Sequence, residues 1–278
     1  MADDVGESGD WAELPSDALA VVFEKLDVTD LMTAAGLVCR AWRQFAATEP
    51  TLWRRVDMCD LKDDLDADAM ARTAVDRAAC TMEAFSADFF VTDDLLLYFS
   101  LRASSLKSLT LNFCPVSNIC MAEAMRGFPH LEKLDMTICR FLFGDLCRSI
   151  GRACPQLKSF RLNVDYLISS VHRADDTEAL GIAHSMPKLR ELQLIGNNLS
   201  NDGLISILNH CTHLESLDIR GCIRVRMDDA LKSKCARIRN LKLPENSISD
   251  YLDRIFSYTS IAYSVPDDPY GPLYDPLF

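Results

Sequence analysis

The sequence predicts an α+β protein in which a short N-terminal helical unit precedes a curved solenoid of alternating strands and helices. Two observations predict this architecture. A leucine pattern recurs six times between residues 106 and 246, and the stretch 11–53, which lacks that pattern, is dense in large apolar side chains. The chain has 278 residues, of which 49% are hydrophobic and 25% charged. This ordinary globular composition provides enough apolar residues for a sizeable core.

The solenoid is predicted by the pattern L-x-x-L-x-L-x-x-(C/N). Its copies begin at Leu106, Leu131, Leu157, Leu189, Leu214 and Ile238. Successive copies start 25, 26, 32, 25 and 24 residues apart, and all but one of these spacings lie in the range of roughly 20–29 residues typical of leucine-rich repeats. Two weaker copies precede them, with apolar residues at Trp53, Val56, Met58 and at Met82, Phe85, Ala87.

Each repeat combines a strand with a helix. The Leu-x-Leu alternation predicts a short strand whose leucines point into the solenoid, and we expect the Cys or Asn that follows to turn inward and satisfy backbone groups at the bend. Apolar residues at helical spacing predict helices such as 146–153 and 203–209. Most of the eleven cysteines are therefore repeat positions, and since no C-x-x-C pair occurs, we expect them to be reduced thiols.

The spacing of 32 residues marks an insertion in one repeat. Residues 177–184 predict its regular helix, with Leu180 and Ala183 facing inward. The surplus is then expected at 166–176, as a loop at the exit of the strand and bordering the concave face.

Charge excludes some classes of partner. The net charge is −12 and the pI is near 4.8, so nonspecific attraction to nucleic acid or to an anionic membrane is disfavoured. Residues 1–70 hold 16 acidic and 6 basic residues. The first ten residues have no secretory-signal character, and no stretch approaches the roughly 20 apolar residues of a membrane helix. We expect an intracellular protein of the nucleus or cytoplasm.

The stretch from Trp11 to Trp53 predicts three short helices. Pro15 and Ser16 mark the start of the first, and residues 29–30 that of the second. The third is expected to carry an apolar stripe formed by Val38, Trp42 and Phe45. About forty residues cannot bury this many large apolar side chains among themselves, so some of them are expected to face a partner.

The same stretch resembles the F-box, L-P-x-(E/D)-L…I-x-x-x-L…D-L…V-C-(K/R)-x-W-(R/K)…L-W, over the whole motif. Leu14-Pro15, Asp17, Val38-Cys39-Arg40 and Leu52-Trp53 match it directly, whereas Phe23 stands where isoleucine is more usual. The resemblance implies docking onto a Skp-type adaptor. By position, the residues that it assigns to this contact or to its immediate support are Leu14, Pro15, Leu19, Phe23, Leu26, Leu31, Val38, Cys39 and Trp42.

Blocks of sequence from residue 11 to residue 247 are similar to plant F-box/leucine-rich-repeat proteins, which are substrate receptors of Skp–cullin–F-box (SCF) ubiquitin ligases. The resemblance implies a Skp adaptor and, through it, a cullin as partners, with a protein substrate held by the repeats. Transfer would be accelerated by a raised effective concentration. A second hypothesis is a leucine-rich-repeat binding or inhibitory protein that pairs with a Skp adaptor outside any ligase. A third, small-ligand sensing, requires a deep pocket that an open arc of repeats lacks.

Other chemistries are not supported by the sequence. His184 and the run His210-Cys211-Thr212-His213 contain zinc-binding residue types, but no second cluster is spaced to complete a site. Asp64, Asp66 and Asp68 mimic the start of a calcium loop, but Ala69 replaces the required glycine. Phosphate-binding and nucleophile-elbow motifs do not occur. We predict no cofactor, no metal and no catalytic residue.

Substrate binding is predicted on the concave face of the solenoid. The residues that flank the strand leucines should point out of this face in two columns of mixed charge with hydrogen-bonding groups, which suit a polar protein surface. The predicted substrate-binding residues are Thr110, Asp135, Arg161, Asn163, Gln193, Asp218, Arg220 and Lys242. The alternative is a sheet face that is merely solvated.

These predictions divide the chain into a disordered acidic tail (1–10), the F-box (11–53), a bridging segment whose strand 53–58 caps the solenoid (54–80), the repeats (81–250) and a C-terminal tail (251–278). The end of the tail holds four prolines and is expected to be extended and exposed. The alternative is docking through Tyr263, Tyr270, Tyr274 and Phe278.

Overall fold

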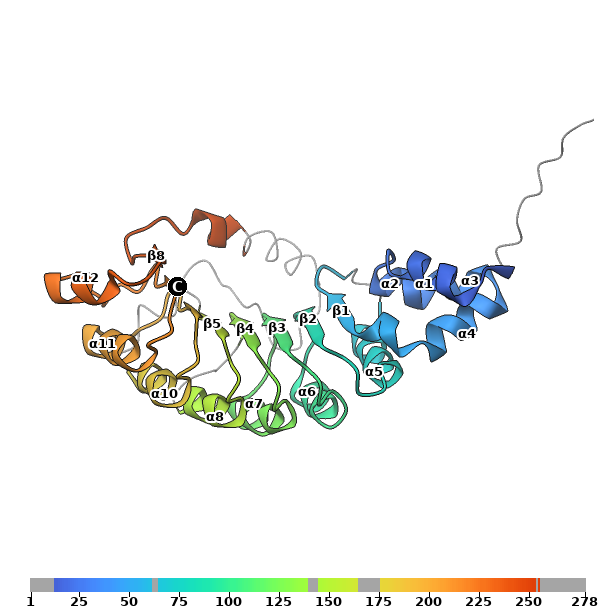
Figure 1. The fold of residues 1–278 in the computed structure, drawn as a ribbon, viewed down its shortest axis with the longest axis horizontal. Helices are drawn as coiled ribbons and strands as arrows, with labels where there is room; N and C mark the ends of the chain where they lie inside the picture. The colour runs from blue at the N-terminus through green and yellow to red at the C-terminus, as the bar shows by residue number, and fades with distance from the viewer. Residues whose placement is uncertain (1–12, 62–64, 140–144, 165–175, 254, 256–278) are drawn as a thin grey trace, which may run out of the picture.

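A computed structural model describes residues 13–61, 65–139, 145–164, 176–253 and 255. The molecule is a curved solenoid with a helical unit at its N-terminal end (Figure 1). Strands line the concave side of the arc and helices the convex side, as predicted. No helix in these residues is long and apolar enough to cross a bilayer.

The helical unit holds one more α-helix than the three predicted. Its elements are α1 (Ser16–Phe23), α2 (Val28–Thr33), α3 (Ala35–Val38), α4 (Arg40–Thr48) and the 3₁₀ helix η2 (Pro50–Trp53). Val38 ends α3 and does not share a helix with Trp42, so the predicted stripe is wrong. Cys39 is extended, and its Sγ accepts a hydrogen bond from the backbone N–H of Trp42 at 3.4 Å, which caps α4. The cap of α2 is Asp27, whose Oδ1 accepts from the Asp30 N–H at 2.8 Å.

The described residues form one eight-stranded parallel sheet in sequential order. Its strands are β1 (Arg55–Met58), β2 (Ala84–Asp88), β3 (Ser108–Asn112), β4 (Lys133–Thr137), β5 (Ser159–Asn163), β6 (Glu191–Gln193), β7 (Ser216–Asp218) and β8 (Asn240–Lys242). The register pairs the predicted leucine positions with one another, for example Leu109 with Leu134 and Leu192 with Leu217. The weaker copies follow it, because Val56 pairs with Phe85.

Helices cover the convex side of the sheet. They are α5 (Ala67–Arg77), α6 (Asp93–Ser100), α7 (Asn118–Ala124) with the 3₁₀ turn η3 (Met125–Gly127), α8 (Leu146–Ala153), α10 (Thr177–Ser185), α11 (Asn201–His210) and α12 (Asp229–Cys235). The helices predicted at 146–153, 177–184 and 203–209 are confirmed. Within α10, Ala183 is buried as predicted, but Leu180 is 38% exposed, because Ala179 and Ile182 carry the inward face. The predicted loop lies almost wholly at 165–175, outside the described residues.

Cysteines close the bends after the strands, as predicted. The Sγ–H of Cys222 donates to the carbonyl oxygen of Leu194 at 2.9 Å, and that of Cys139 to Leu111 at 3.4 Å. A second set was not predicted: Cys154 and Cys211, at the ends of α8 and α11, donate to carbonyl oxygens of the preceding repeat. Both sets of thiol hydrogen bonds link consecutive repeats.

An acidic side chain links neighbouring repeats at two equivalent places. Asp176 accepts from the backbone N–H of Ser200 at 2.8 Å and from its hydroxyl at 2.6 Å. Asp93 accepts from Ser117 in the same way, at 2.7 and 2.6 Å. Because Ser200 and Ser117 are also the N-caps of α11 and α7, each pair fixes a helix start against the helix before it.

Trp53 joins the helical unit to the solenoid. Its side chain is fully buried, its indole N–H donates to the Ala46 carbonyl oxygen at 2.9 Å, and the Arg77 guanidinium lies 5.0 Å from its ring centre. β1 is the first strand of the sheet. The segment 54–80 therefore supplies a complete strand and helix, β1 and α5, and the solenoid extends to the helical unit.

Candidate interaction surfaces

The helical unit has a small core that includes four of the predicted adaptor-binding residues. Leu19, Phe23, Leu31 and Trp42 are buried within it. Phe23 is completely buried and packs edge to face against Trp42 at 5.2 Å and against Phe45 at 5.5 Å. Aromatic packing therefore accommodates the phenylalanine that replaces the usual isoleucine. These four buried side chains lie beneath the outer surface of the helical unit and support it.

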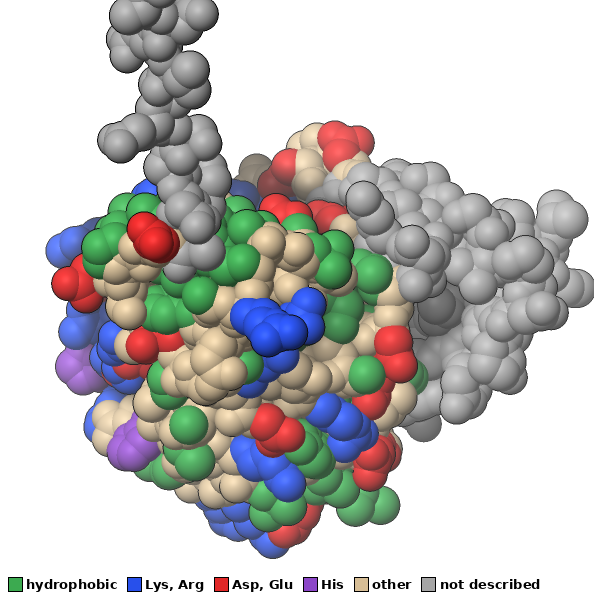
Figure 2. All heavy atoms as spheres, turned by 90° about the vertical axis from the view of Figure 1, so that its right-hand side faces the viewer, with side chains coloured by type: hydrophobic (Ala, Val, Ile, Leu, Met, Phe, Trp, Pro, Cys, Tyr) green, Lys and Arg blue, Asp and Glu red, His purple; other side chains and the backbone are tan. Residues whose placement is uncertain are grey.

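Part of the outer surface of the unit is apolar. Of the remaining predicted residues, Leu14, Leu26 and Cys39 are half-buried, whereas Pro15 and Val38 are exposed. Figure 2 shows hydrophobic side chains gathered on this end of the molecule.

Two further apolar side chains on this unit were missed by sequence reasoning. Leu37 is 79% exposed and Val21 is 60% exposed, compared with 52% for Val38. The placement of Leu37 follows from the cap at Cys39, which ends the short helix α3 and leaves residues 37–38 facing outward. A Cys-x-x-Trp spacing, in which a thiol caps the next helix, is the signal that could have indicated this break.

The concave face differs from the prediction in its accessibility. Thr110, Arg161 and Gln193 are partly accessible, and Lys242 is exposed. The other four predicted residues are buried: Asp135, Asn163, Asp218 and Arg220. Substrate binding by the eight residues stays a prediction.

Polar contacts across the strands explain part of this burial. Asp135 accepts from the Thr137 hydroxyl at 3.0 Å and pairs with Arg161 at 3.3 Å. Asn163 donates to the Thr137 hydroxyl at 3.0 Å and accepts from the Ile195 N–H at 3.2 Å. Parallel strands lie about 4.8 Å apart, so side chains of consecutive repeats satisfy one another.

The C-terminal segment explains the rest. After β8 the chain turns, and residues 249–253 and 255 are helical. Tyr251 and Ile255 are buried in an apolar cluster with Phe113 and Ile195. These two residues fall in the predicted C-terminal tail, and the structure places them against the solenoid. The four aromatic residues proposed for docking, from Tyr263 onward, lie outside the described residues.

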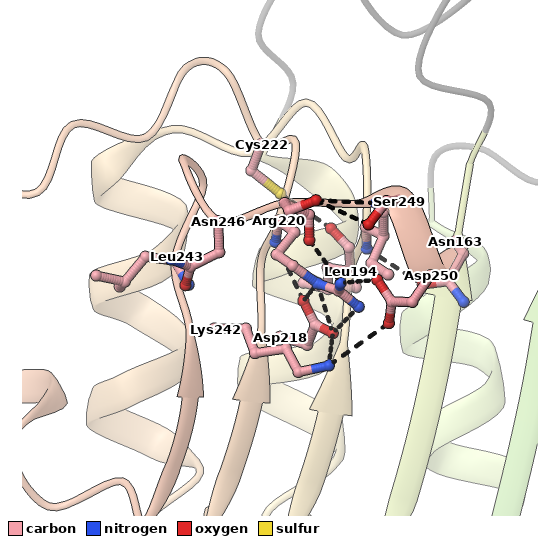
Figure 3. Close-up of polar contacts among 12 residues, drawn as sticks. Asn163, Leu194, Asp218, Arg220, Cys222, Lys242, Leu243, Asn246, Ser249 and Asp250 are labelled. Atoms are coloured by element: carbon pink, nitrogen blue, oxygen red, sulfur yellow. Dashed lines mark hydrogen bonds and ion pairs between the residues drawn. The ribbon is translucent and has the colours of Figure 1, made fainter. Parts of the chain in front are cut away.

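A charged network holds the start of this segment (Figure 3). The buried Arg220 guanidinium donates to both carboxylate oxygens of Asp218 and, through Nη1, to the Ser247 carbonyl oxygen at 2.8 Å and to Asp250. Lys242 lies 3.7 Å from Asp218 and 3.9 Å from Asp250. The hydrogen bond from Arg220 lowers the pKa of Asp250 below its ordinary value.

The histidines of the rejected zinc site do not converge with Cys211. The rings of His184 and His210 stack edge to face 4.9 Å apart and are exposed, whereas the buried Cys211 thiol donates to the Met186 carbonyl oxygen at 3.5 Å. Over the described ranges no group of three or more metal-ligating side chains occurs.

The acidic residues of the calcium-loop mimic have structural partners. Asp66 caps α5 by accepting from the Ala69 N–H at 3.0 Å, and Asp68 pairs with Arg72 at 2.7 Å. Asp64 lies outside the described residues.

The arrangement defines a leucine-rich-repeat protein with an N-terminal F-box-like unit. The "F-box-like" family model matches residues 11–59, and the "Leucine Rich repeat" model matches residues 185–208 and 210–222. The putative F-box/LRR-repeat protein 22 of Arabidopsis thaliana is 36% identical over 253 residues, which cover 89% of this chain and 81% of that protein. The chain therefore belongs to the F-box/LRR-repeat family.

Two further relatives also come from Arabidopsis thaliana. The F-box protein SKIP19 is 36% identical over 273 residues, which cover 96% of this chain and 85% of the relative. The putative F-box/LRR-repeat protein 23 is 38% identical over 243 residues, covering 85% of this chain but only 54% of the relative, so the chain spans about half of that protein. Membership of this family agrees with the prediction that the chain is not an enzyme.

Among solved structures, a chain from the crystal structure of the yeast Rad7 and Elc1 complex is similar, with a TM-score of 0.46 and 16% identity. The match covers 82% of this chain and 70% of that one.

Proposed function

We propose that this protein is the substrate-recognition subunit of an SCF-type ubiquitin ligase. The F-box binds a Skp-type adaptor, the adaptor connects the chain to a cullin, and the repeats hold a protein substrate. The mechanism is geometric: bringing the substrate to the ligase raises the effective concentration for transfer. Family membership supports this proposal.

The single observation that carries it is the exposed apolar surface of the F-box. Val21, Leu37 and Val38 are all more than half exposed on a unit of about forty residues. Leu37 and Val38 are adjacent in the chain, and contiguous exposed apolar side chains of this kind mark protein interaction sites. Burying each of them in an interface contributes about 1.5–3 kcal/mol, so their substitution should affect binding strongly and folding weakly.

The test is coexpression of the full chain with a Skp adaptor, followed by coprecipitation. We expect Leu37→Asp/Val38→Asp to abolish adaptor binding without lowering the melting temperature, because neither side chain belongs to the core. Leu101→Asp is the matched control, since Leu101 is 81% exposed but lies on the solenoid; it should bind the adaptor like the unsubstituted chain. Adaptor binding by the double variant would contradict the proposed docking surface.

Cullin in the same precipitate separates the ligase from the alternative hypothesis. An SCF receptor should bring down adaptor and cullin together. If the adaptor is present and cullin is absent, the chain pairs with the adaptor outside a ligase.

A further inference from the structure

The C-terminal segment 247–255 lies on the face predicted to bind substrate. It contacts the solenoid at two kinds of site. At its start, Asp250 pairs with Arg220 and Lys242; further along, Tyr251 and Ile255 fill the apolar cluster, and the Tyr251 hydroxyl donates to the Val164 carbonyl oxygen at 3.4 Å. The segment thus presents an acidic residue, the aromatic residue next to it and an aliphatic residue four positions later.

The apolar part of this surface is built at a conformational cost. Positive φ angles recur where the chain leaves several of the strands: 56° at Asp60, 69° at Gly196 and 70° at Gly221, but also 69° at Phe89, 56° at Phe113 and 51° at Ile138. Glycine adopts this conformation freely, whereas bulky and β-branched residues are strained there.

The three strained side chains all serve this surface. Phe113 is a buried member of the cluster, and Phe89 and Ile138 pack against it. The rings of Phe89 and Phe113 are stacked with centres 4.9 Å apart. This cluster is separate from the continuous core of the solenoid. Strained residues of this kind concentrate at binding sites. Here the three strained residues place their apolar side chains together on the concave face.

The docked segment does not provide hydrogen-bond partners for all the polar side chains of the sheet beneath it. Beneath Tyr251 and Ile255 lies a cavity of about 30 Å³, bordered by Asn112, Asp135 and Asn163. The Asn112 Oδ1 atom is buried and has no hydrogen-bond partner in the part of the chain that the structure describes. An unsatisfied buried acceptor costs about 1–3 kcal/mol of stability. A ligand that donates a hydrogen bond to Asn112 would therefore bind this part of the sheet more favourably than the resident segment does.

We infer that this surface recognises a short helical segment of a partner protein with the pattern Asp/Glu, then Tyr/Phe, then a branched aliphatic residue four positions later, and that residues 247–255 occupy it until such a partner displaces them. The inference rests on the proposed function in one respect: the partner is the ligase substrate. The carboxylate meets Arg220 and Lys242, and the two apolar side chains meet Phe113 and Ile195.

The resident segment competes through its covalent link. Only a short turn, 243–248, joins it to β8, and a short tether gives an effective concentration in the millimolar range. A free peptide must overcome this competition. Releasing the segment should therefore raise the affinity for a free peptide by at least about tenfold.

The test uses the full chain copurified with its Skp adaptor. The probe is a fluorescein-labelled peptide with the sequence NSISDYLDRIF, residues 246–256. We expect Asp250→Lys/Tyr251→Ala in the chain to strengthen peptide binding about tenfold or more, measured by fluorescence anisotropy. A peptide that carries the same two substitutions should not bind. Adding Lys242→Glu to the released chain should weaken binding of the unsubstituted peptide, because Lys242 is exposed and faces the carboxylate.

Specific outcomes overturn the inference. One is a released chain that binds the two peptides equally or binds neither. Another is a released chain that dimerises on size exclusion, since the surface would then serve self-association. If the double variant melts at a lower temperature, Asp250→Lys alone is used, because the Asp250 side chain is 62% exposed. Adaptor and cullin binding by the same samples tests the proposed function separately. If the chain binds the peptide but neither adaptor nor cullin, the inferred peptide-binding surface stands and the proposed role in a ligase is contradicted.

Discussion

Arg220 and Asp250 are thirty residues apart in the sequence and form an ion pair that ties the C-terminal segment to the solenoid. Arg220 is buried, while the Asp250 carboxylate is largely exposed. The same guanidinium is already paired with Asp218 at 2.9 Å. The charge of Arg220 is therefore balanced within the sheet by Asp218. The other N–H groups of its guanidinium can donate to a segment that lies on the concave face.

Docking of the C-terminal segment should weaken at low pH. The pKa of Asp250 is lowered by the hydrogen bond from Arg220. A carboxyl whose pKa is lower in the docked state stabilises docking fully above its pKa in the released state, about 3.9, and this stabilisation is lost as the pH falls through the docked pKa. We expect the amide resonances of residues 251–252 to be unchanged between about pH 7 and pH 5 and to shift toward those of a released segment below about pH 4. Asp250→Asn should remove this pH dependence and weaken docking at neutral pH.

Phe23 should dominate the stability of the F-box. Its ring is completely buried between Trp42 and Phe45, and truncation of such a residue to alanine costs about 3–5 kcal/mol. All three tryptophans of the chain lie at or before residue 53, so tryptophan fluorescence during urea unfolding reports on this unit. Phe23→Ala should shift the transition to lower urea. Val21→Ala, on the exposed side of the same helix, should change stability by no more than about 0.5 kcal/mol; equal effects of the two would show that Phe23 is not the core.

The strand register could be predicted from the sequence because two signals coincide. The leucine period fixes which residues are equivalent, and the Leu-x-Leu alternation fixes which of them point inward, so Leu109, Leu134 and Leu192 occupy the expected positions. The break at Cys39 could not be predicted in this way, because Val38, Trp42 and Phe45 also fit one continuous helix. A thiol that accepts a backbone hydrogen bond is a weak signal for a helix cap.

The candidate binding face was predicted only in part. Periodicity placed Arg161 and Lys242 on the concave side, but burial there depends on a contact between distant segments. Nothing periodic links Tyr251 to Phe113 or Ile195. The positive φ of Phe113 and Ile138 also opposes the local preference of these residues. Tertiary packing over this face, together with polar contacts between strands, decided which predicted residues remained accessible.

The convex helices should be sensitive to added methyl groups where two helices approach closely. A Cβ atom on Gly151, in α8, would lie 2.8 Å from the Ser185 carbonyl oxygen at the end of α10. Gly151→Ala should therefore lower the melting temperature, because backbone must move. Gly36→Ala is the control: the nearest atoms, on the flexible Arg43 side chain, are 3.6 Å away, and alanine favours the helix by up to about 1 kcal/mol. A stabilising effect of Gly151→Ala would contradict the close approach of α8 and α10.

Thiol labelling should separate the structural cysteines from the accessible one. Cys80 is exposed, whereas Cys114, Cys154 and Cys222 are buried. Burial raises the pKa of the Cys222 thiol to about 12 and that of Cys154 to about 12, so almost none of either is thiolate near neutral pH, and the thiolate is the reactive form. With a disulfide reagent at pH 8, Cys80 should be modified first, and the buried set only when the solenoid unfolds. Mass spectrometry of the labelled peptides identifies the sites. Cys80→Ser should reduce the fast phase, to which the half-buried Cys39 and Cys59 can also contribute, and leave the slow phase unchanged. Modification of Cys222 in the fast phase would mean that the bends between repeats open readily.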